Sequence, residues 1–243
     1  MAGHSKWANI RHRKGAQDAK RGKLFTKIAK EITVAAKLGG DDPDGNPRLR
    51  AAIVKARGLS MPKDNIDRAI KRGVGGNDTS DYFEKTYEGY GPGGVAVMVE
   101  CLTDNVNRTV SEVRHAFSRS GGNLGTDGSV SWMFHKKGTI VYAKEKISDF
   151  DTFFEAALEA GADDVKEEGE VYEIECAPDT FSDVKEALDK LEIEADHAEV
   201  GLVPENYSEL DEDKAATLAK LVDILEDNDD VQSVFHNGQF PEA

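Results

Sequence analysis

The chain has 243 residues and carries 31 Lys and Arg against 46 Asp and Glu, a formal net charge of -15. A hydrophobic fraction of 39% beside 32% charged residues excludes an intrinsically disordered chain, and the length allows one to three domains. The longest apolar run, Val95 to Val99, is too short for a membrane span, so we expect no membrane partner.

The N-terminus and the cysteines indicate the compartment. Charged residues begin at Lys6, with no apolar stretch before the first expected helix, and this pattern argues against a secretory signal. Cys101 and Cys176 lie in strand-like apolar runs and lack the spacing of metal or redox sites. We therefore expect buried, reduced thiols and a cytoplasmic protein.

The charge is divided sharply along the chain. Residues 1–77 hold 18 Lys and Arg against 7 Asp and Glu, a net charge of +11, and the remainder carries -26. Up to residue 30 the only acid is Asp18. The basic side chains there are Lys6, Arg11, Arg13, Lys14, Lys20, Arg21, Lys23, Lys27 and Lys30. A basic arm on an acidic body favours a polyanionic partner, and we expect nucleic acid; a solvated basic face without a partner is the plainer alternative.

Residues 1–21 have weak periodicity and fit an extended arm or a loosely held helix. Apolar spacing, caps and glycine stops then predict helices from Lys23 to Gly39-Gly40, from Arg48 to Gly58 and from Ser60–Lys63 to Gly73. The exposed faces of the last two helices carry Arg50, Lys55, Arg57, Lys63, Arg68, Lys71 and Arg72. A small helical bundle with a basic surface is therefore expected.

The periodicity changes after a linker at 75–77. Strands are predicted at 94–102, 129–134, 138–142, 171–176, 194–203 and 231–235, and helices at 104–121, 149–160, 181–191 and 211–226. These elements can be sorted into two split β-α-β sandwiches. One is contained in about 137–203, and the other pairs 95–134 with 205–237, so the first is an insertion in the second.

Several short motifs fail the chemical tests for a cofactor, metal or catalytic site. Gly89–Gly94 matches a dinucleotide-binding string, but Pro92 and a following strand in place of a helix indicate a loop. Asp42–Gly45 lacks calcium-loop spacing and the histidines are scattered, so we expect neither a metal nor a cofactor. The acids at 163–170 are typical of solvated charge, and no Ser, Cys or His has a nucleophile context; we expect no enzyme.

The residue types of the basic arm fit nucleic acid. Lys and Arg neutralise phosphates whatever the sequence, and affinity of that kind falls as salt rises. Trp7 and His12 offer flat surfaces on which an unpaired base can stack, although Trp7 as a packing anchor is an equal alternative. Arg11 and Arg13 suit a second mode, the reading of guanine edges in a groove.

Longer motifs are spread over essentially the whole chain. They are MAGHSKWANIRHRK at 1–14, DAKRGK at 18–23, NPRLR at 46–50, MPKDNI at 61–66, YEGYGPGG at 87–94, TDNVNRT at 103–109 and GGNLG at 121–125. Together they resemble the YebC/PmpR family. The resemblance implies an α+β fold, with a helical N-terminal bundle followed by two ferredoxin-like α/β domains, one inserted in the other. The expected domains are 1–79, 80–134 with 204–243, and 135–203.

The resemblance also implies function. The family's nucleic-acid contacts carry over to Lys6, Trp7, Arg11, His12, Arg13, Lys14, Lys20, Arg21 and Lys23, and Lys27 joins them on the basic face of the first helix. Our first hypothesis is a non-enzymatic, DNA-binding regulator of transcription. The second is a translation factor that binds ribosomal RNA or mRNA, with the ribosome as a partner. A third, an enzyme acting between the domains, has no supporting motif.

Overall fold

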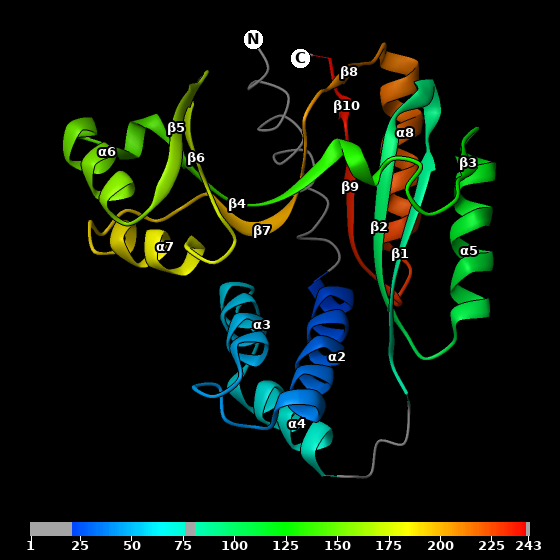
Figure 1. Ribbon diagram of the computed structural model, residues 1–243, viewed down its shortest axis with the longest axis horizontal. Helices are drawn as coiled ribbons and strands as arrows, with labels where there is room; N and C mark the ends of the chain where they lie inside the picture. The colour runs from blue at the N-terminus through cyan, green and yellow to red at the C-terminus, as the bar shows by residue number, and fades with distance from the viewer. Residues whose placement is uncertain (1–20, 76–80, 242–243) are drawn as a thin grey trace.

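The computed structural model describes residues 21–75 and 81–241 (Figure 1). A helical domain is followed by two sheets, each of which has helices on one side. The predicted fold class is confirmed: a helical bundle precedes two α/β units, and one of these is inserted in the other.

The helical domain consists of α2 (Arg21–Gly39), α3 (Pro47–Gly58) and α4 (Lys63–Val74). The predicted start of α3 is confirmed, since the Asn46 side chain accepts a hydrogen bond from the Leu49 N–H at 3.1 Å. The same side chain donates to the Ala35 carbonyl at 2.8 Å and so connects α3 to α2. The buried core of this domain is formed by Ile28, Ile32, Ala35, Ala36, Leu49, Ala52, Ile53, Ala56, Met61, Ile66 and Ala69.

The prediction that Gly73 closes the third helix is wrong, because α4 continues to Val74. Gly73 is needed for close packing instead. A Cβ at this position would lie 2.4 Å from the Thr33 carbonyl oxygen, so only glycine lets α4 approach α2 this closely. The Thr33 hydroxyl donates to the Ala69 carbonyl at 3.1 Å across the same contact.

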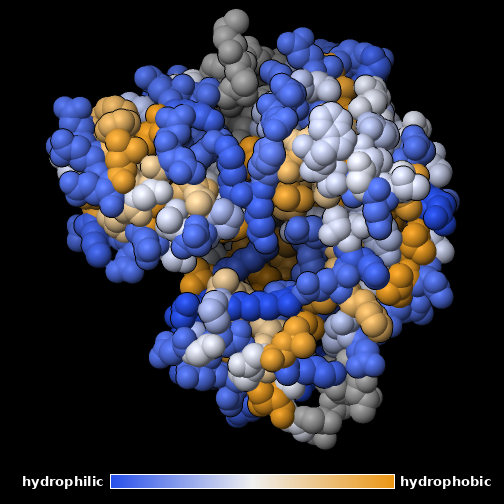
Figure 2. All heavy atoms as spheres, in the orientation of Figure 1, coloured by the Kyte–Doolittle hydropathy of each residue, from blue (hydrophilic) through white to orange (hydrophobic). Residues whose placement is uncertain are grey.

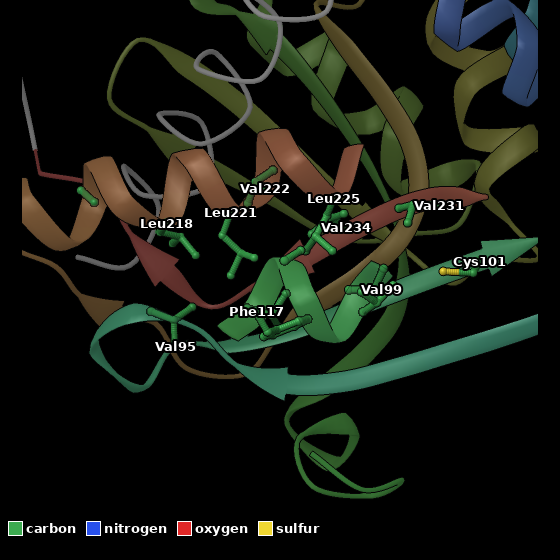
Figure 3. Packing of buried hydrophobic residues seen from close by; sticks show 14 of the residues in the cluster. Val95, Val99, Cys101, Phe117, Leu218, Leu221, Val222, Leu225, Val231 and Val234 are labelled. Carbon is green, nitrogen blue, oxygen red and sulfur yellow. The ribbon is translucent and has the colours of Figure 1, made fainter. Parts of the chain in front are cut away.

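The second domain has a sheet of order β3-β1-β2-β9. Its elements are β1 (Phe83–Tyr90), β2 (Ala96–Thr103), α5 (Val106–Arg119), β3 (Asn123–Leu124), α8 (Glu212–Glu226) and β9 (Val231–His236). Every neighbouring pair in the sheet is antiparallel, so β2 and β3 run parallel with β1 between them. This is a split β-α-β unit in which the intervening strand comes first in the chain. Val99, Phe117, Leu221 and Val234 pack between the sheet and its helices (Figure 3).

The inserted domain has a sheet of order β5-β6-β4-β7. Its elements are β4 (Phe134–Ala143), α6 (Phe150–Glu159), β5 (Ala162–Glu168), β6 (Val171–Cys176), α7 (Phe181–Asp189) and β7 (His197–Pro204). The chain order β-α-β-β-α-β is that of a ferredoxin-like unit. Pairing of Phe134 with Pro204 brings the two ends of the insertion together. A short parallel pair, β8 (Ser208–Glu209) with β10 (Gly238–Gln239), follows in the second domain.

One prediction about local structure is wrong. The strand expected at 129–134 is a loop with a short 3-10 turn at Ser131–Met133, because the buried Glu88 carboxylate accepts hydrogen bonds from three backbone N–H groups of this loop. The acids at 163–170 largely belong to strand β5, and most of them are exposed, in keeping with the expected solvated charge; the Glu167 carboxylate accepts a hydrogen bond from Lys144. The Gly89–Gly94 string is a strand end and turn, as predicted. Cys101 and Cys176 are buried free thiols.

Candidate nucleic-acid interface

Most of the predicted contact residues lie outside the described residues: Lys6, Trp7, Arg11, His12, Arg13, Lys14 and Lys20. Arg21 is the first residue of α2. Among the predicted contacts, the structure therefore places the side chains of Lys23 and Lys27.

Both lysines point at the C-terminal end of α8. The Lys23 ammonium donates to the Asp227 carbonyl at 3.2 Å and lies 3.4 Å from its carboxylate. The Lys27 ammonium donates to the Glu226 carbonyl at 2.5 Å. The last carbonyls of a helix lack partners within the helix and carry the negative end of its dipole, so cations are favoured there. The two lysines thus join the helical domain to the second domain.

The next basic side chain along this face of α2 extends the contact. The Lys30 ammonium donates to the Asp230 carboxylate at 3.0 Å and to the carbonyls of Asp229 and Leu102 at 3.0 and 3.2 Å. Asp230 is only 4% exposed, and its carboxylate also accepts from Arg108 at 2.5 Å and Thr109 at 2.9 Å. Burial alone would raise the pKa of this carboxyl, but these donors outweigh burial and hold the pKa below its ordinary value.

Lys27 does not fit the predicted contact with nucleic acid. Its side chain is buried, 5% exposed, and its ammonium is directed at α8. Burial lowers the pKa of Lys27 to about 8, against the opposing effect of Glu226, Asp229 and Asp227 nearby. A buried ammonium with a carbonyl partner contributes to domain packing, so we leave Lys27 out of the interface. Lys23 is half exposed but already paired with Asp227.

Most of the exposed positive charge of the helical domain lies on α3 and α4. Arg57, Lys63 and Lys71 are exposed, and none of them makes an ion pair or side-chain hydrogen bond with the described residues. Arg48, in contrast, binds the Glu31 carboxylate with two of its nitrogens, at 2.7 and 3.1 Å. Residues 21–75 hold 13 Lys and Arg against 6 Asp and Glu, a net charge of +7. Figure 2 shows hydrophilic side chains along the edge of this domain that faces the sheets, with apolar ones beside them.

A shallow groove of about 330 Å³ runs between α2 and α4. Its floor is apolar and its rim is basic. The lining includes Phe25, Ala29, Met61, Asn65, Arg68 and Arg72. Arg68 is oriented along the rim, since its guanidinium donates to the Asp64 carbonyl at 3.2 Å and to the Asn65 side chain. The groove brings a flat apolar surface, a carboxamide and two guanidinium groups together in one place.

Sequence reasoning expected a basic surface on α3 and α4, and exposed charges are indeed found there. It did not place Arg68 and Arg72 beside Phe25, because that contact depends on how α4 packs on α2. Within residues 21–75 and 81–241, no group of three or more His, Cys, Asp or Glu is arranged to hold a metal ion. None of the helices in that part of the chain has the length and apolar character needed to cross a bilayer.

Comparison with known proteins places the chain in a family. Residues 5–76 match the TACO1/YebC protein N-terminal domain, and residues 82–238 match the TACO1/YebC second and third domain. The chain therefore belongs to the TACO1/YebC family, as its motifs predicted.

Individual relatives agree over nearly the full length. The chain is 58% identical to a protein named as a probable transcriptional regulatory protein in Geobacter sp. (strain M21), over 98% of this chain and 95% of the relative. It is 57% identical to the probable transcriptional regulatory protein YebC of Shigella boydii serotype 4 (strain Sb227), over 98% and 96%. The crystal structure of the conserved hypothetical protein Aq1575 from Aquifex aeolicus superposes with a TM-score of 0.80, at 47% identity and 93% coverage of both chains.

Proposed function

We propose that this protein is a non-enzymatic, nucleic-acid-binding regulator of transcription that works in the cytoplasm and holds DNA through its basic helical domain. The observation that carries the proposal is the exposed positive charge of Arg57, Lys63 and Lys71 on α3 and α4, which has no ion-pair partner within residues 21–75 and 81–241. Lys and Arg without intramolecular partners are free to neutralise phosphates and release counterions. The names of the relatives support a role in transcription.

The charge distribution sets the orientation of binding. The helical domain is basic, and the rest of the chain carries the acidic excess. A phosphate backbone is therefore attracted to one end of the molecule and repelled by the sheets. The α2 lysines that face α8 hold the basic domain in place on the acidic body, and the basic arm before α2 supplies further cations for the same polyanion.

RNA is the second candidate target, in a translation factor that acts on the ribosome. The groove between α2 and α4 favours it, because an apolar floor beside guanidinium groups suits an unpaired base better than a paired one. Duplex DNA offers its base edges only within its grooves. Both candidates use the same basic domain, so the choice between them rests on the nucleic acid recovered from cells.

Crosslinking in growing cells, with DNA and RNA sequenced from the same sample, tests the proposal. Enrichment at a few promoters, lost when Arg11, Arg13 and Lys14 are changed to Ala, is the expected result. Enrichment at one patch of ribosomal RNA with little DNA would replace the transcriptional role by the translational one. Recovery of neither nucleic acid would overturn the proposal. The triple variant should keep its melting temperature, so that loss of binding is not loss of fold.

A further inference from the structure

The groove between α2 and α4 combines an apolar floor with a basic rim. Phe25 is partly buried and Met61 is buried, so the floor is apolar and fixed by packing with the domain core. Arg68 and Arg72 are exposed on the rim, and both belong to α4, four residues apart. Residues at this spacing lie on the same face of a helix, one turn from each other.

We propose that this groove is a binding site for one unpaired nucleotide of a single-stranded nucleic acid, with the base on the apolar floor and its phosphate at Arg68 and Arg72. The inference rests on the proposed function and deepens it, since it names the strand state of the ligand. A base has an apolar face for Phe25 and polar edges for Asn65, and its phosphate can accept hydrogen bonds from the guanidinium groups on the rim.

The size and openness of the site fit this ligand. A volume of about 330 Å³ falls at the small end of the range of ligand pockets, about 300–1,000 Å³. Because the groove is shallow and open, a chain can run across it and place one base inside. A base within a duplex is stacked and paired, so it cannot enter without being unpaired first. The site therefore selects single strands, loops or melted segments.

Electrostatics favours a nucleic acid over an uncharged ligand. The helical domain holds a net charge of +7 over residues 21–75, and the groove opens on this surface. The contacts of Arg68 with the Asp64 carbonyl and Asn65 are local to α4 and leave guanidinium donors for a phosphate. Planar guanidinium groups also stack on bases, which a lysine cannot do.

The test uses the full-length protein and short oligonucleotides, as RNA and as DNA. Each strand is prepared intact, with one central abasic position, and as a duplex. We expect the intact single strand to bind about tenfold more tightly than the abasic strand, because stacking of one base is lost. Comparison of the RNA oligonucleotides with the DNA oligonucleotides shows which of the two nucleic acids supplies the nucleotide. Equal affinity for intact and abasic strands would overturn the proposal, even if both bind tightly.

Four variants separate the groove from general charge. Arg68→Ala with Arg72→Ala should lose the preference for the intact strand. Thr26→Leu, on the exposed lip of the groove, fills the space while every charge is kept, and should lose it as well. Arg68→Lys keeps the charge but not the planar group, and should retain only part of the preference. Lys71→Ala removes an exposed charge of α4 outside the groove lining, and should weaken all strands about twofold and equally.

These outcomes distinguish the site from the proposed function. If no strand or duplex binds at any salt concentration, the proposed function fails. If nucleic acid binds but the groove variants behave like Lys71→Ala, the domain binds phosphates and the groove proposal is wrong. Thermal unfolding of each variant shows whether the helical domain is intact. The proposal is also contradicted if Thr26→Leu keeps its melting temperature and still binds the intact strand with the affinity of the parent protein.

Discussion

Two groups of basic residues in the helical domain differ in their surroundings. Lys23, Lys27 and Lys30 on α2 meet the carbonyls and carboxylates at the end of α8 and the loop that follows it. Arg57 and Lys63, with the other exposed cations of α3 and α4, face solvent. In the sequence the two groups look alike. The contacts in the structure distinguish them. The basic residues of one group bind an acidic segment of the same chain, whereas those of the other remain exposed to an external polyanion.

The largest effect should come from breaking the first group at its acidic partner. Asp230→Ala removes a buried carboxylate that accepts hydrogen bonds from Lys30, Arg108 and Thr109, so these three side chains lose a shared acceptor. We expect the free energy of unfolding in urea to fall by about 3 kcal/mol. Asp227→Ala, which removes an exposed pair with Lys23, is the matched control and should cost less than about 1 kcal/mol. Equal losses in the two variants would contradict the assignment.

The same carboxylate predicts an acid limit to stability. The folded-state pKa of Asp230 lies below its ordinary value, despite burial, because Arg108, Lys30 and Thr109 donate to the charged form. Its contribution is therefore present above the unfolded-state pKa and is lost as the pH falls through the folded-state pKa. Urea unfolding across the acid range should show a steeper loss for the parent protein than for Asp230→Ala. Parallel curves would contradict this prediction.

Substitutions at two glycines, one in α4 and one in α3, test how these helices pack without changing their charge. Gly73→Ala places a Cβ 2.4 Å from the Thr33 carbonyl oxygen and should destabilise the protein by about 2 kcal/mol, because α4 must move away from α2. Gly58→Ala, at the end of α3, meets no heavy atom within 4 Å and should be neutral or slightly stabilising. Both are read from urea unfolding. A loss in the second variant as large as in the first would argue against close packing as the cause.

Lys27→Met tests the buried lysine of the first group through the pH dependence of stability, where the expected effect is small. In the parent protein, burial lowers the pKa of Lys27 to about 8, below the ordinary 10.5. Between these two pH values, Lys27 is largely protonated in the unfolded chain and largely deprotonated in the folded protein. Stability should therefore rise with pH across this window, and the rise should be smaller in the variant. Unfolding at about pH 7 and about pH 10 checks it. Nucleic-acid affinity should stay within about twofold, since the side chain is buried; a larger loss would return Lys27 to the interface.

The fold could be predicted where periodicity is strong and local. Asn46-Pro47 gave the start of α3, and the alternating valines of β2 gave a central strand. Strand β1 was missed because its first four residues are exposed and include the charged Glu84 and Lys85, so that part of the strand resembles a loop. Strand β5 was missed for the same reason. The segment predicted as a strand at 129–134 was misread because the conformation of this loop depends on Glu88, a buried acid about forty residues away that has no local signature.

The candidate site was predictable in its charge but not in its contacts. The excess of Lys and Arg over residues 21–75 is plain in the sequence. The role of Lys27 is not, because its partner Glu226 lies 199 residues further along the chain. The groove at Arg68 and Arg72 depends on the approach of α4 to α2 at Gly73, a tertiary feature that residue patterns do not specify.

The most direct test of the central claim measures nucleic-acid affinity against salt for two triple variants. Arg57, Lys63 and Lys71 are changed to Ala in one, and Lys190, Lys214 and Lys220, exposed in the other domains, in the control. Both remove three positive charges. We predict that the first variant binds about tenfold more weakly, with a shallower dependence of affinity on salt, and that the control is unchanged. Equal losses in the two variants, or none in the first, would contradict the assignment of α3 and α4 as the interface.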